Sequence, residues 1–441
     1  TATTFNGIPF FSDATNNSMY THDVSATDST ASGNTAYGFG ALDAITTGDG
    51  NTAIGKSAGG AINSGYDNVI IGASAGDALT TGGDNVVIGV SALSAEDAHG
   101  RNVAVGRKAL FVQDAGADAY NVAVGYHAGA AVTTGVYNTL LGGLAGDALT
   151  EGGENTALGY LALSAETKGD RNVALGAYAL FTQNNTTNAD IYNTAVGYNA
   201  GFAITTGTLN TLIGGLAGDA LTTGASNVAI GKDALSTKTI GAGDVAIGYQ
   251  ALQDLDGGDA FNVAVGYQAG RNVTTGTNNI LIGAAAGDAL TTGHYNVAIG
   301  HQALKTEDAH GRNIAIGHQA LETLDAGADA YNVAIGYDAG TAMTTGSQNI
   351  LVGGLAGDAL TTGTSNIAIG LLALSGEDTG GRNIAIGYGA LRVQDYDGNG
   401  YNVAIGYDAG TAVSTGTLNT IIGGLAGDAL TTGAQNTAIG H

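Results

Sequence analysis

The hydrophobic and polar positions of this chain follow one short pattern that repeats from Asn34 onward. Its clearest copy is the stretch 331–346, YNVAIGYDAGTAMTTG, in which an Asn precedes three apolar residues and a Gly, followed by an Ala-containing segment and a Thr-Thr-Gly ending. The Asn, replaced once by Asp244, marks 24 coils, and 18 of the 23 intervals between these marks are 17 residues long. Such a short and regular period predicts a solenoid, in which each repeat forms one coil.

The apolar segment of each coil predicts a β-strand. In the copy quoted above, Val333 and Ile335 point one way and Ala334 the other, because side chains alternate along a strand. We therefore predict an all-β fold, a parallel β-solenoid of about 24 coils, over residues 34–441. Residues 1–33 lack the repeat, and we expect them to form an N-terminal cap or an attachment segment.

The coils differ from one another in a cycle of four. One class, mostly of the form YNVAIGY, starts at marks that are 70, 72, 69, 70 and 70 residues apart. The five longer intervals all precede a coil of this class, so insertions are expected on one side of the solenoid. The marks of this class are Asn51, Asn121, Asn193, Asn262, Asn332 and Asn402.

The second class of coil carries a bulky residue at the middle position of its strand. These residues are Ile70, Leu140, Leu212, Leu281, Leu351 and Ile421. A strand with one wet face would be polar there, so we expect both faces of the sheet to be buried. Identical chains packed about a long axis would cover the second face, and a wider single-chain β-helix is the alternative.

The amino-acid composition limits the classes of partner that the protein can bind. The net charge of −25, from 38 acidic and 13 basic residues, argues against nucleic acid and anionic membranes as partners. No run of 18 apolar residues exists, so we predict no membrane insertion. The absence of Cys fits an extracellular or virion-surface protein that does not depend on disulfides.

Two insertion loops contain alternating oxygen-bearing residues of the kind that calcium loops use. These residues are Asp254, Asp256 and Asp259 in DLDGGD, and Asp395, Asp397 and Asn399 in DYDGNG. Their oxygen atoms suit a hard cation, and the Gly allows a sharp turn. The twelfth position after Asp395 is Gly406 instead of the usual bidentate Glu, and the same residue types build ordinary surface turns. The loops are therefore compatible with calcium binding and with a plain turn.

Four arginines directly precede an Asn mark and follow a Glu by five residues. The pairs are Glu96 with Arg101, Glu166 with Arg171, Glu307 with Arg312, and Glu377 with Arg382. We expect a local ion pair in each of these loops, with receptor contact by the Arg edge as the alternative.

No residue set in the repeat is arranged for catalysis. The eight His residues show no spacing typical of a metal site or a catalytic triad, and Cys is absent, so we predict that the protein is not an enzyme. Tyr residues at the coil corners are expected to cover coil edges, and glycan binding by exposed Tyr rows is the alternative. Ice binding by the Thr-Thr-Gly segments is a minor alternative, because the Thr pairs are missing from the intervening coils.

The phrase N-V-A-I-G, followed by Ala and a Gly-containing corner, resembles the head repeats of trimeric autotransporter adhesins and the NTAIGYQAL-type repeats of phage tail fibres. The resemblance covers residues 34–441. For the adhesin family it implies a left-handed parallel β-roll, assembled as a homotrimer, that binds host or matrix surfaces. The present sequence departs from the adhesins in its longer unit and in lacking the heptads of a coiled-coil stalk.

These observations together predict the shaft of an extracellular fibre, either a virion tail fibre or a cell-surface adhesin that attaches to a receptor or glycan. The alternative is a structural subunit of an extracellular filament that assembles end to end. The last coil begins at Asn436 and is followed by only five residues. We therefore expect the end at His441 to be continued by further chain or covered by another protein.

Overall fold

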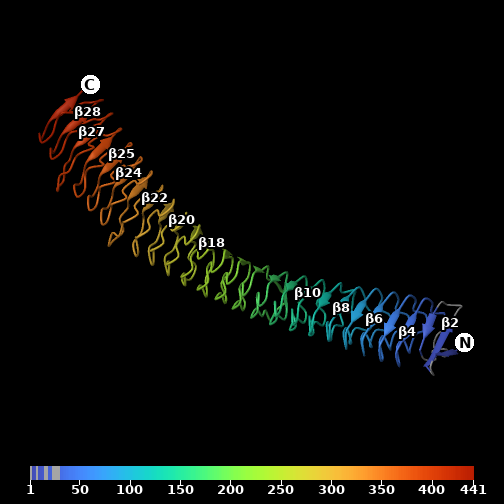
Figure 1. Cartoon of the computed structure of the whole chain (residues 1–441). Coiled ribbons are helices and arrows are strands. Elements are labelled where there is room, and N and C mark those ends of the chain that lie inside the picture. The colour runs from blue at the N-terminus through green and yellow to red at the C-terminus, as the bar shows by residue number, and fades with distance from the viewer. Residues whose placement is uncertain (1, 6–7, 14–17, 22–29) are drawn as a thin grey trace. The chain divides into compact units, whose positions relative to one another are not determined.

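The computed structural model describes residues 2–5, 8–13, 18–21 and 30–441. The chain divides into two compact units, Thr1–Gly224 and Ala225–His441. Each unit is a stack of coils with one short strand per coil (Figure 1), and the predicted parallel β-solenoid is confirmed. The described residues form no helix, so none that could cross a bilayer is present among them.

The first unit opens with strands outside the repeat. Strands β1 (Ala2–Phe5) and β2 (Ile8–Asp13) are antiparallel, as are β2 and β3 (Ser18–Tyr20), whereas β3 pairs in parallel with β4 (Thr35–Tyr37), the first repeat strand. Strand β3 therefore extends the stack beyond the repeat. The predicted cap or attachment role of residues 1–33 stays a prediction, and several of these residues lie outside the described part.

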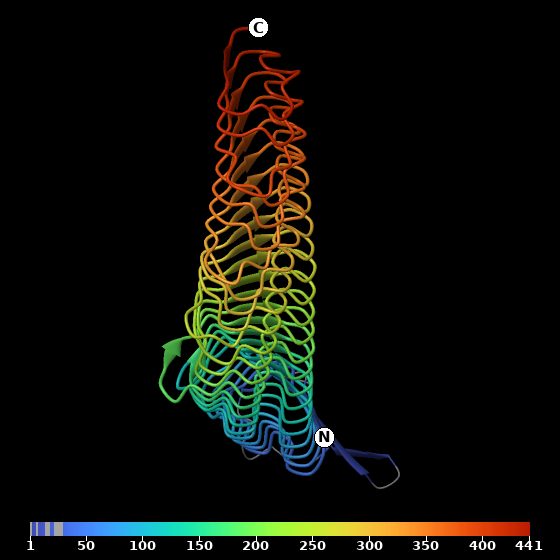
Figure 2. The same ribbon diagram turned by 90° about the vertical axis from the view of Figure 1, so that its left-hand side faces the viewer.

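The remaining strands of the first unit pair in parallel and in register, apart from two short strands in loops that form their own sheet, β12 and β14. These strands are β5 (Thr52–Ile54), β6 (Val69–Ile71), β7 (Val86–Ile88), β8 (Val103–Val105), β9 (Val122–Val124), β10 (Thr139–Leu141), β11 (Thr156–Leu158), β12 (Gly169–Asp170), β13 (Val173–Leu175), β14 (Ala189–Asp190), β15 (Thr194–Val196) and β16 (Thr211–Ile213). Figure 2 shows the green loop that carries β14 projecting from the side of the coils.

The second unit contains only repeat strands, again parallel and in register; Val263, for example, pairs with Ile280. They are β17 (Val228–Ile230), β18 (Val245–Ile247), β19 (Val263–Val265), β20 (Ile280–Ile282), β21 (Val297–Ile299), β22 (Ile314–Ile316), β23 (Val333–Ile335), β24 (Ile350–Val352), β25 (Ile367–Ile369), β26 (Ile384–Ile386), β27 (Val403–Ile405), β28 (Thr420–Ile422) and β29 (Thr437–Ile439).

A ladder of buried asparagines joins the coils, and coil positions are numbered here from this Asn as position 0. Asn349 shows the pattern: its Oδ1 accepts the backbone N–H of Asn366 at 2.9 Å. Its Nδ2 donates to Oδ1 of Asn332 at 3.2 Å and to the carbonyl oxygen of Gly363 at 2.9 Å. Asn is suited to this place because its amide carries both an acceptor and two donors.

A glycine follows every repeat strand, at position 4, because the backbone of the next coil leaves no room for a Cβ there. At Gly336 the backbone φ is +147°, and a Cβ built on this residue would lie 2.3 Å from the carbonyl oxygen of Gly353 in the next coil. No side chain fits at that distance, and an L-residue would also be strained at that φ. The stack therefore requires Gly at this position.

The four-coil cycle is a packing cycle of the interior. Gly340, at position 8 of its coil, leaves space that Leu351 and Leu321 of the two adjacent coils fill: a Cβ on Gly340 would lie 2.7 and 3.0 Å from their methyl groups. Leu351 is the bulky middle residue of its strand, and it is fully buried inside its own solenoid. Contrary to expectation, the bulky middle residues do not indicate burial of the outer sheet face, because they compensate for small residues inside.

This complementary packing can be tested with Gly340 and Leu351. Gly340→Ala adds a methyl group against Leu351 at a φ of +60°, and we expect it to lower the free energy of unfolding by about 1–3 kcal/mol. Leu351→Ala leaves a cavity and should cost about 2–5 kcal/mol. Because the two volume changes oppose each other, the double variant should lose less than the sum of the single losses in denaturant unfolding. Additive losses would contradict this account of the cycle.

One position of the ladder is an Asp, and a buried Lys compensates for it. Asp244 accepts the backbone N–H of Asn262 at 2.8 Å, as an Asn would, but it lacks the amide donor. Nζ of Lys238, fully buried at position 11 of the preceding coil, lies 3.0 Å from Oδ2 of Asp244 and donates to the carbonyl oxygen of Gly258 at 3.0 Å. Gly258 is the residue that the missing Nδ2 would otherwise bond, so the ammonium replaces that donor.

We predict that this ion pair can be replaced by the residues used elsewhere in the repeat. Lys238→Leu alone leaves the Asp244 carboxylate buried without its cation, which should cost about 3–5 kcal/mol of unfolding free energy. Lys238→Leu together with Asp244→Asn restores an ordinary ladder position next to an aliphatic residue, and stability should return to at least the wild-type value. Denaturant unfolding of the single and double variants measures the difference. A double variant as unstable as Lys238→Leu would show that the amide does not substitute for the pair.

Candidate functional site

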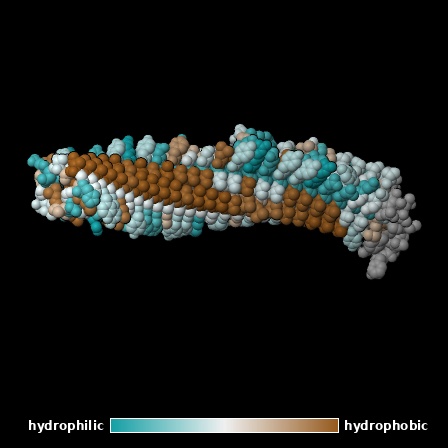
Figure 3. Space-filling model, turned by 90° about the horizontal axis from the view of Figure 1, so that it is seen from above, coloured by the Kyte–Doolittle hydropathy of each residue, from teal (hydrophilic) through white to brown (hydrophobic). Residues whose placement is uncertain are grey.

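The outer face of the sheet is apolar and open to solvent. Strand positions 1 and 3 point outward, and Ile280 and Ile282 of β20 are 40% and 37% exposed, whereas Leu281 between them is fully buried. In each unit, hydrophobic side chains form a band on the face seen in Figure 3. The most exposed aliphatic residues of the repeat strands are Ile54, Val69, Val124, Leu158 and Ile213 in the first unit, and Ile280, Ile282, Ile335, Ile350, Ile369, Ile405, Ile422 and Ile439 in the second.

Such a surface is unusual for a sheet that faces water. Antiparallel sheets with one wet face alternate apolar and polar residues, and parallel strands that are apolar on both sides are typical of sheets covered on both sides. Large exposed apolar patches are typical of interaction surfaces.

A second surface is the edge that carries the insertion loops. All five insertions follow position 11 of a coil, where about half of the other coils have Thr-Thr-Gly. The longest insertion contributes β14, which pairs with β12 of the preceding coil, and a later one pairs Asn399 with Gly381. Each of these two loops is therefore attached to the coil before it.

The four arginines of this edge contact tyrosines, not the glutamates predicted as partners. Arg312 lies 5.5 Å over the ring of Tyr331, donates to its hydroxyl at 3.1 Å, and forms an ion pair with Asp329. Arg101, Arg171 and Arg382 lie in the same way over Tyr120, Tyr192 and Tyr401. The expected pairs with Glu96, Glu166, Glu307 and Glu377 are not formed, because these glutamates are fully buried at position 11 while the arginines are exposed.

The buried glutamates instead accept hydrogen bonds from the loops. Glu166 is the most fully bonded: Oε1 accepts the backbone N–H groups of Thr167, Lys168, Gly169 and Asn185 at 2.8–3.1 Å. Its Oε2 accepts the side-chain amides of Gln183 at 2.8 Å and Asn185 at 2.9 Å. This carboxylate therefore closes the insertion loop onto the solenoid.

We predict that Glu166 and Arg171 act independently. Glu166→Ala leaves six donors without their acceptor and should lower the unfolding free energy by about 3 kcal/mol or more. Arg171→Ala removes exposed contacts and should cost less than about 1 kcal/mol. A double-mutant cycle in denaturant should give a coupling energy within about 0.5 kcal/mol of zero. A coupling above 1 kcal/mol would support the ion pair that the sequence suggested.

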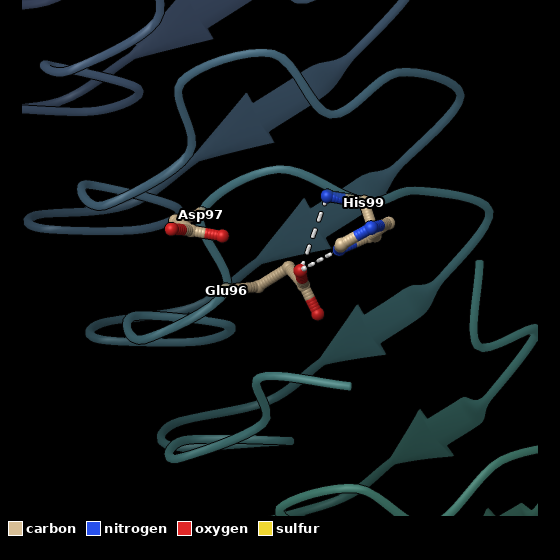
Figure 4. A group of neighbouring side chains, drawn as sticks. All are labelled: Glu96, Asp97 and His99. Carbon is tan, nitrogen blue, oxygen red and sulfur yellow. Dashed lines mark hydrogen bonds and ion pairs between the residues drawn. The ribbon is translucent and has the colours of Figure 1, made fainter. Parts of the chain in front are cut away.

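Three groups of acidic and His side chains, within the described residues, bring possible metal-ligand atoms to within 4.8 Å of one another. They are Glu96 with Asp97 and His99, Glu307 with Asp308 and His310, and Glu377 with Asp378 and Asp395. Figure 4 shows the first group, in which the Glu96 carboxylate faces the backbone N–H of His99 at 3.1 Å and its ring Nδ1 at 3.5 Å.

The third group is the most strongly acidic. Glu377 is fully buried, and its Oε1 accepts the backbone N–H of Gly380 at 2.7 Å. Oε2 of Glu377 and Oδ1 of Asp378 are buried and hydrogen-bond to no described residue. Burial, reinforced by the neighbouring charges of Asp395 and Asp378, raises the pKa of Glu377 to about 7.

The residues predicted as calcium ligands occupy different environments. Asp256 accepts the backbone N–H of Thr239 at 3.2 Å and its hydroxyl at 2.8 Å, and Asp259 accepts the backbone N–H of Ala242 at 2.9 Å. Asp397 accepts the Thr379 hydroxyl at 3.2 Å. Asp254, Asp256, Asp259 and Asp397 belong to none of the three groups above, and Asn399 is exposed. Only Asp395 joins such a group.

Sequence reasoning missed the position-11 glutamates as interior residues. The signal was available in the register of the repeat, because position 11 is aliphatic in most coils, as at Ile62, Leu149 and Leu290. A charged residue at a position that is otherwise apolar indicates a buried polar group with dedicated partners.

Comparison with known proteins adds no relative: no family model, no curated protein and no solved structure matches this chain.

Proposed function

We propose that this chain is a non-enzymatic shaft of an extracellular fibre, on a virion tail or a cell surface, in which identical chains pack together through the apolar outer face of the sheet. The observation that supports the proposal is the band of partly exposed Ile, Val and Leu at strand positions 1 and 3, present in both units and interrupted by Thr at position 1 of several coils in the first unit.

A second copy of the chain is the partner that best matches this face. Its strands have the same spacing of about 4.8 Å and the same apolar rows, so coil can face coil along the stack. Burial of apolar area contributes about 25 cal/mol per Å², and a row of half-exposed Ile side chains adds up over many coils. Three copies are favoured by the resemblance to trimeric adhesins.

The charge of the chain opposes this association. A net charge of −25 per chain makes copies repel one another. Salt screens repulsion between exposed charges and leaves apolar burial intact, so assembly through this face should tighten as ionic strength rises.

The loop edge supports the attachment role. Exposed tyrosines stack there between coils, with ring centroids 5.7 Å apart for Tyr120 and Tyr137, which directly precede the Asn marks of adjacent coils. Rings that are apolar on their faces and polar at the hydroxyl are suited to contacts with glycans or a protein receptor. Attachment through this edge is compatible with assembly through the sheet face, because the two surfaces use different coil positions.

The test is a comparison of assembly states. Ile280→Glu with Ile350→Glu places charges on the sheet face at two residues that are each 40% exposed in the single chain. We expect wild type to elute as a multimer, three copies by light scattering, and the variant to elute as a folded monomer by the same measurement and circular dichroism.

The matched control is Ile240→Glu with Val393→Glu. These residues are 50% and 47% exposed but lie outside the strands, so this variant should assemble as wild type does. A wild-type chain that stays monomeric at micromolar concentration in high salt, or a face variant that assembles normally, would contradict the proposal.

A further inference from the structure

We infer that Glu377, Asp378 and Asp395 form a binding site for a hard divalent cation, with calcium as the best fit. Glu377 and Asp378 occupy positions 11 and 12 of the coil that begins at Asn366, and Asp395 occupies position 12 of the next coil. Their oxygen atoms lie within 4.8 Å of one another although Asp395 is 17 residues beyond Asp378. The site lies between two coils, and the inference does not depend on the proposed assembly.

The strongest observation is that this group contains carboxylate oxygens without donors. Oε2 of Glu377 and Oδ1 of Asp378 are both buried without a hydrogen bond of normal length and angle from a described residue, although the backbone N–H of Tyr396 lies close enough to Glu377 to lower its pKa, and Glu377 is fully buried as a side chain. A buried carboxylate oxygen without a donor is costly, and three acids in contact repel one another. A bound cation removes both costs.

Two other cycles of the same chain show how position 11 is satisfied without a bound cation; the cycles of Glu96 and Glu307 carry the same two Asp residues, with a His beside the glutamate. In the four-coil cycle that contains Glu166, Thr167 and Asn184 replace the two Asp residues, and Glu166 accepts six hydrogen bonds. In the next four-coil cycle along the chain, position 11 is Lys238, whose buried ammonium is itself the cation and pairs with Asp244 at 3.0 Å. In the group around Glu377 the N–H of Gly380 donates to Oε1 at 2.7 Å, but Nε2 of Gln394, which corresponds to Gln183, makes no hydrogen bond to a described residue, and the group contains no ammonium.

The donor set selects the class of ion. All three ligands are carboxylates, and oxygen-only sites suit calcium and magnesium, whereas zinc favours Cys and His. Glu377 is buried, Asp378 is half-buried and Asp395 is exposed, so one side of the site is open to water. Calcium accepts six to eight oxygens in flexible geometry and can complete its shell with water there, whereas magnesium demands near-octahedral placement.

The site differs from the calcium loop suggested by the sequence DYDGNG. That pattern would use Asp395, Asp397 and Asn399 of one loop, but Asp397 accepts the Thr379 hydroxyl at 3.2 Å and is not part of the group. The bound ion would therefore join the insertion loop to the preceding coil. Glu166 joins its own insertion loop to the solenoid in the same way, but through hydrogen bonds.

Terbium, a luminescent substitute for calcium, tests the inference on the full chain after treatment with EDTA. Tyr396 directly follows Asp395 and can excite a lanthanide bound beside it, so the emission lost in Tyr396→Phe reports this site. We expect wild type to show such emission, and calcium to displace it at about 0.1–1 mM, the range of extracellular calcium modules. Asp378→Asn with Asp395→Asn should abolish the Tyr396-dependent emission or weaken terbium affinity at least tenfold.

The matched control is Asp358→Asn with Asp428→Asn, which removes the same charge from the same unit but leaves this group intact. It should retain the Tyr396-dependent emission, and circular dichroism should show that every variant is folded. Absence of Tyr396-dependent emission in wild type would overturn the inference. Equal terbium affinity in wild type and in the Asp378 and Asp395 double variant would also overturn it.

Discussion

The buried asparagine ladder is the interaction on which the rest of the solenoid depends. Each Asn amide accepts from the next coil and donates to the previous Asn and to a Gly carbonyl in the well-formed stretches, as Asn349 does with Asn366, Asn332 and Gly363. A polar side chain that is buried in nearly every coil needs hydrogen bonds, and the in-register stacking of the coils supplies them at most positions of the ladder. The single Asp in the ladder confirms the constraint, because Asp244 is accompanied by a buried ammonium from Lys238.

Once the register is fixed, every coil position becomes a row. Glycines at position 4 stack at a distance that excludes any Cβ, and the outward residues of the strands become a continuous apolar band within each unit. If a charged residue occupied the same position in every coil, the stacking would also place like charges in a row, where they would repel one another. The four-coil cycle separates the half-buried acids of the AGDAL segment, such as Asp288 and Asp358, by four coils or about 19 Å, which exceeds the Debye length of about 8 Å.

The insertion loops explain why position 11 is polar in some coils. A longer loop adds backbone N–H groups that turn toward the interior, and these groups need acceptors. Glu166 provides one by accepting the N–H of Asn185, and Gln183 connects this carboxylate to the ladder by accepting from Nδ2 of Asn193 at 2.9 Å. The polar interior is therefore a consequence of the loops, and in the groups around Glu96, Glu307 and Glu377 Asp residues occupy the places that Thr167 and Asn184 have beside Glu166.

The sequence by itself determined the period, the strand residues, the solenoid class and the phase of the insertions, because a 17-residue repeat with alternating strand residues leaves one way to bury its apolar side. It did not determine whether the side chains of Leu351 and Glu377 face the interior. Leu351 is bulky because it fills the space over Gly340, which belongs to an adjacent coil and is not a neighbour in the sequence. Nor could local spacing assign Arg312 to Tyr331, or Asp395 to Glu377 and Asp378. These contacts join residues 17 to 19 positions apart. Only the stacking of one coil on the next brings such residues together, and that stacking is a property of the tertiary structure.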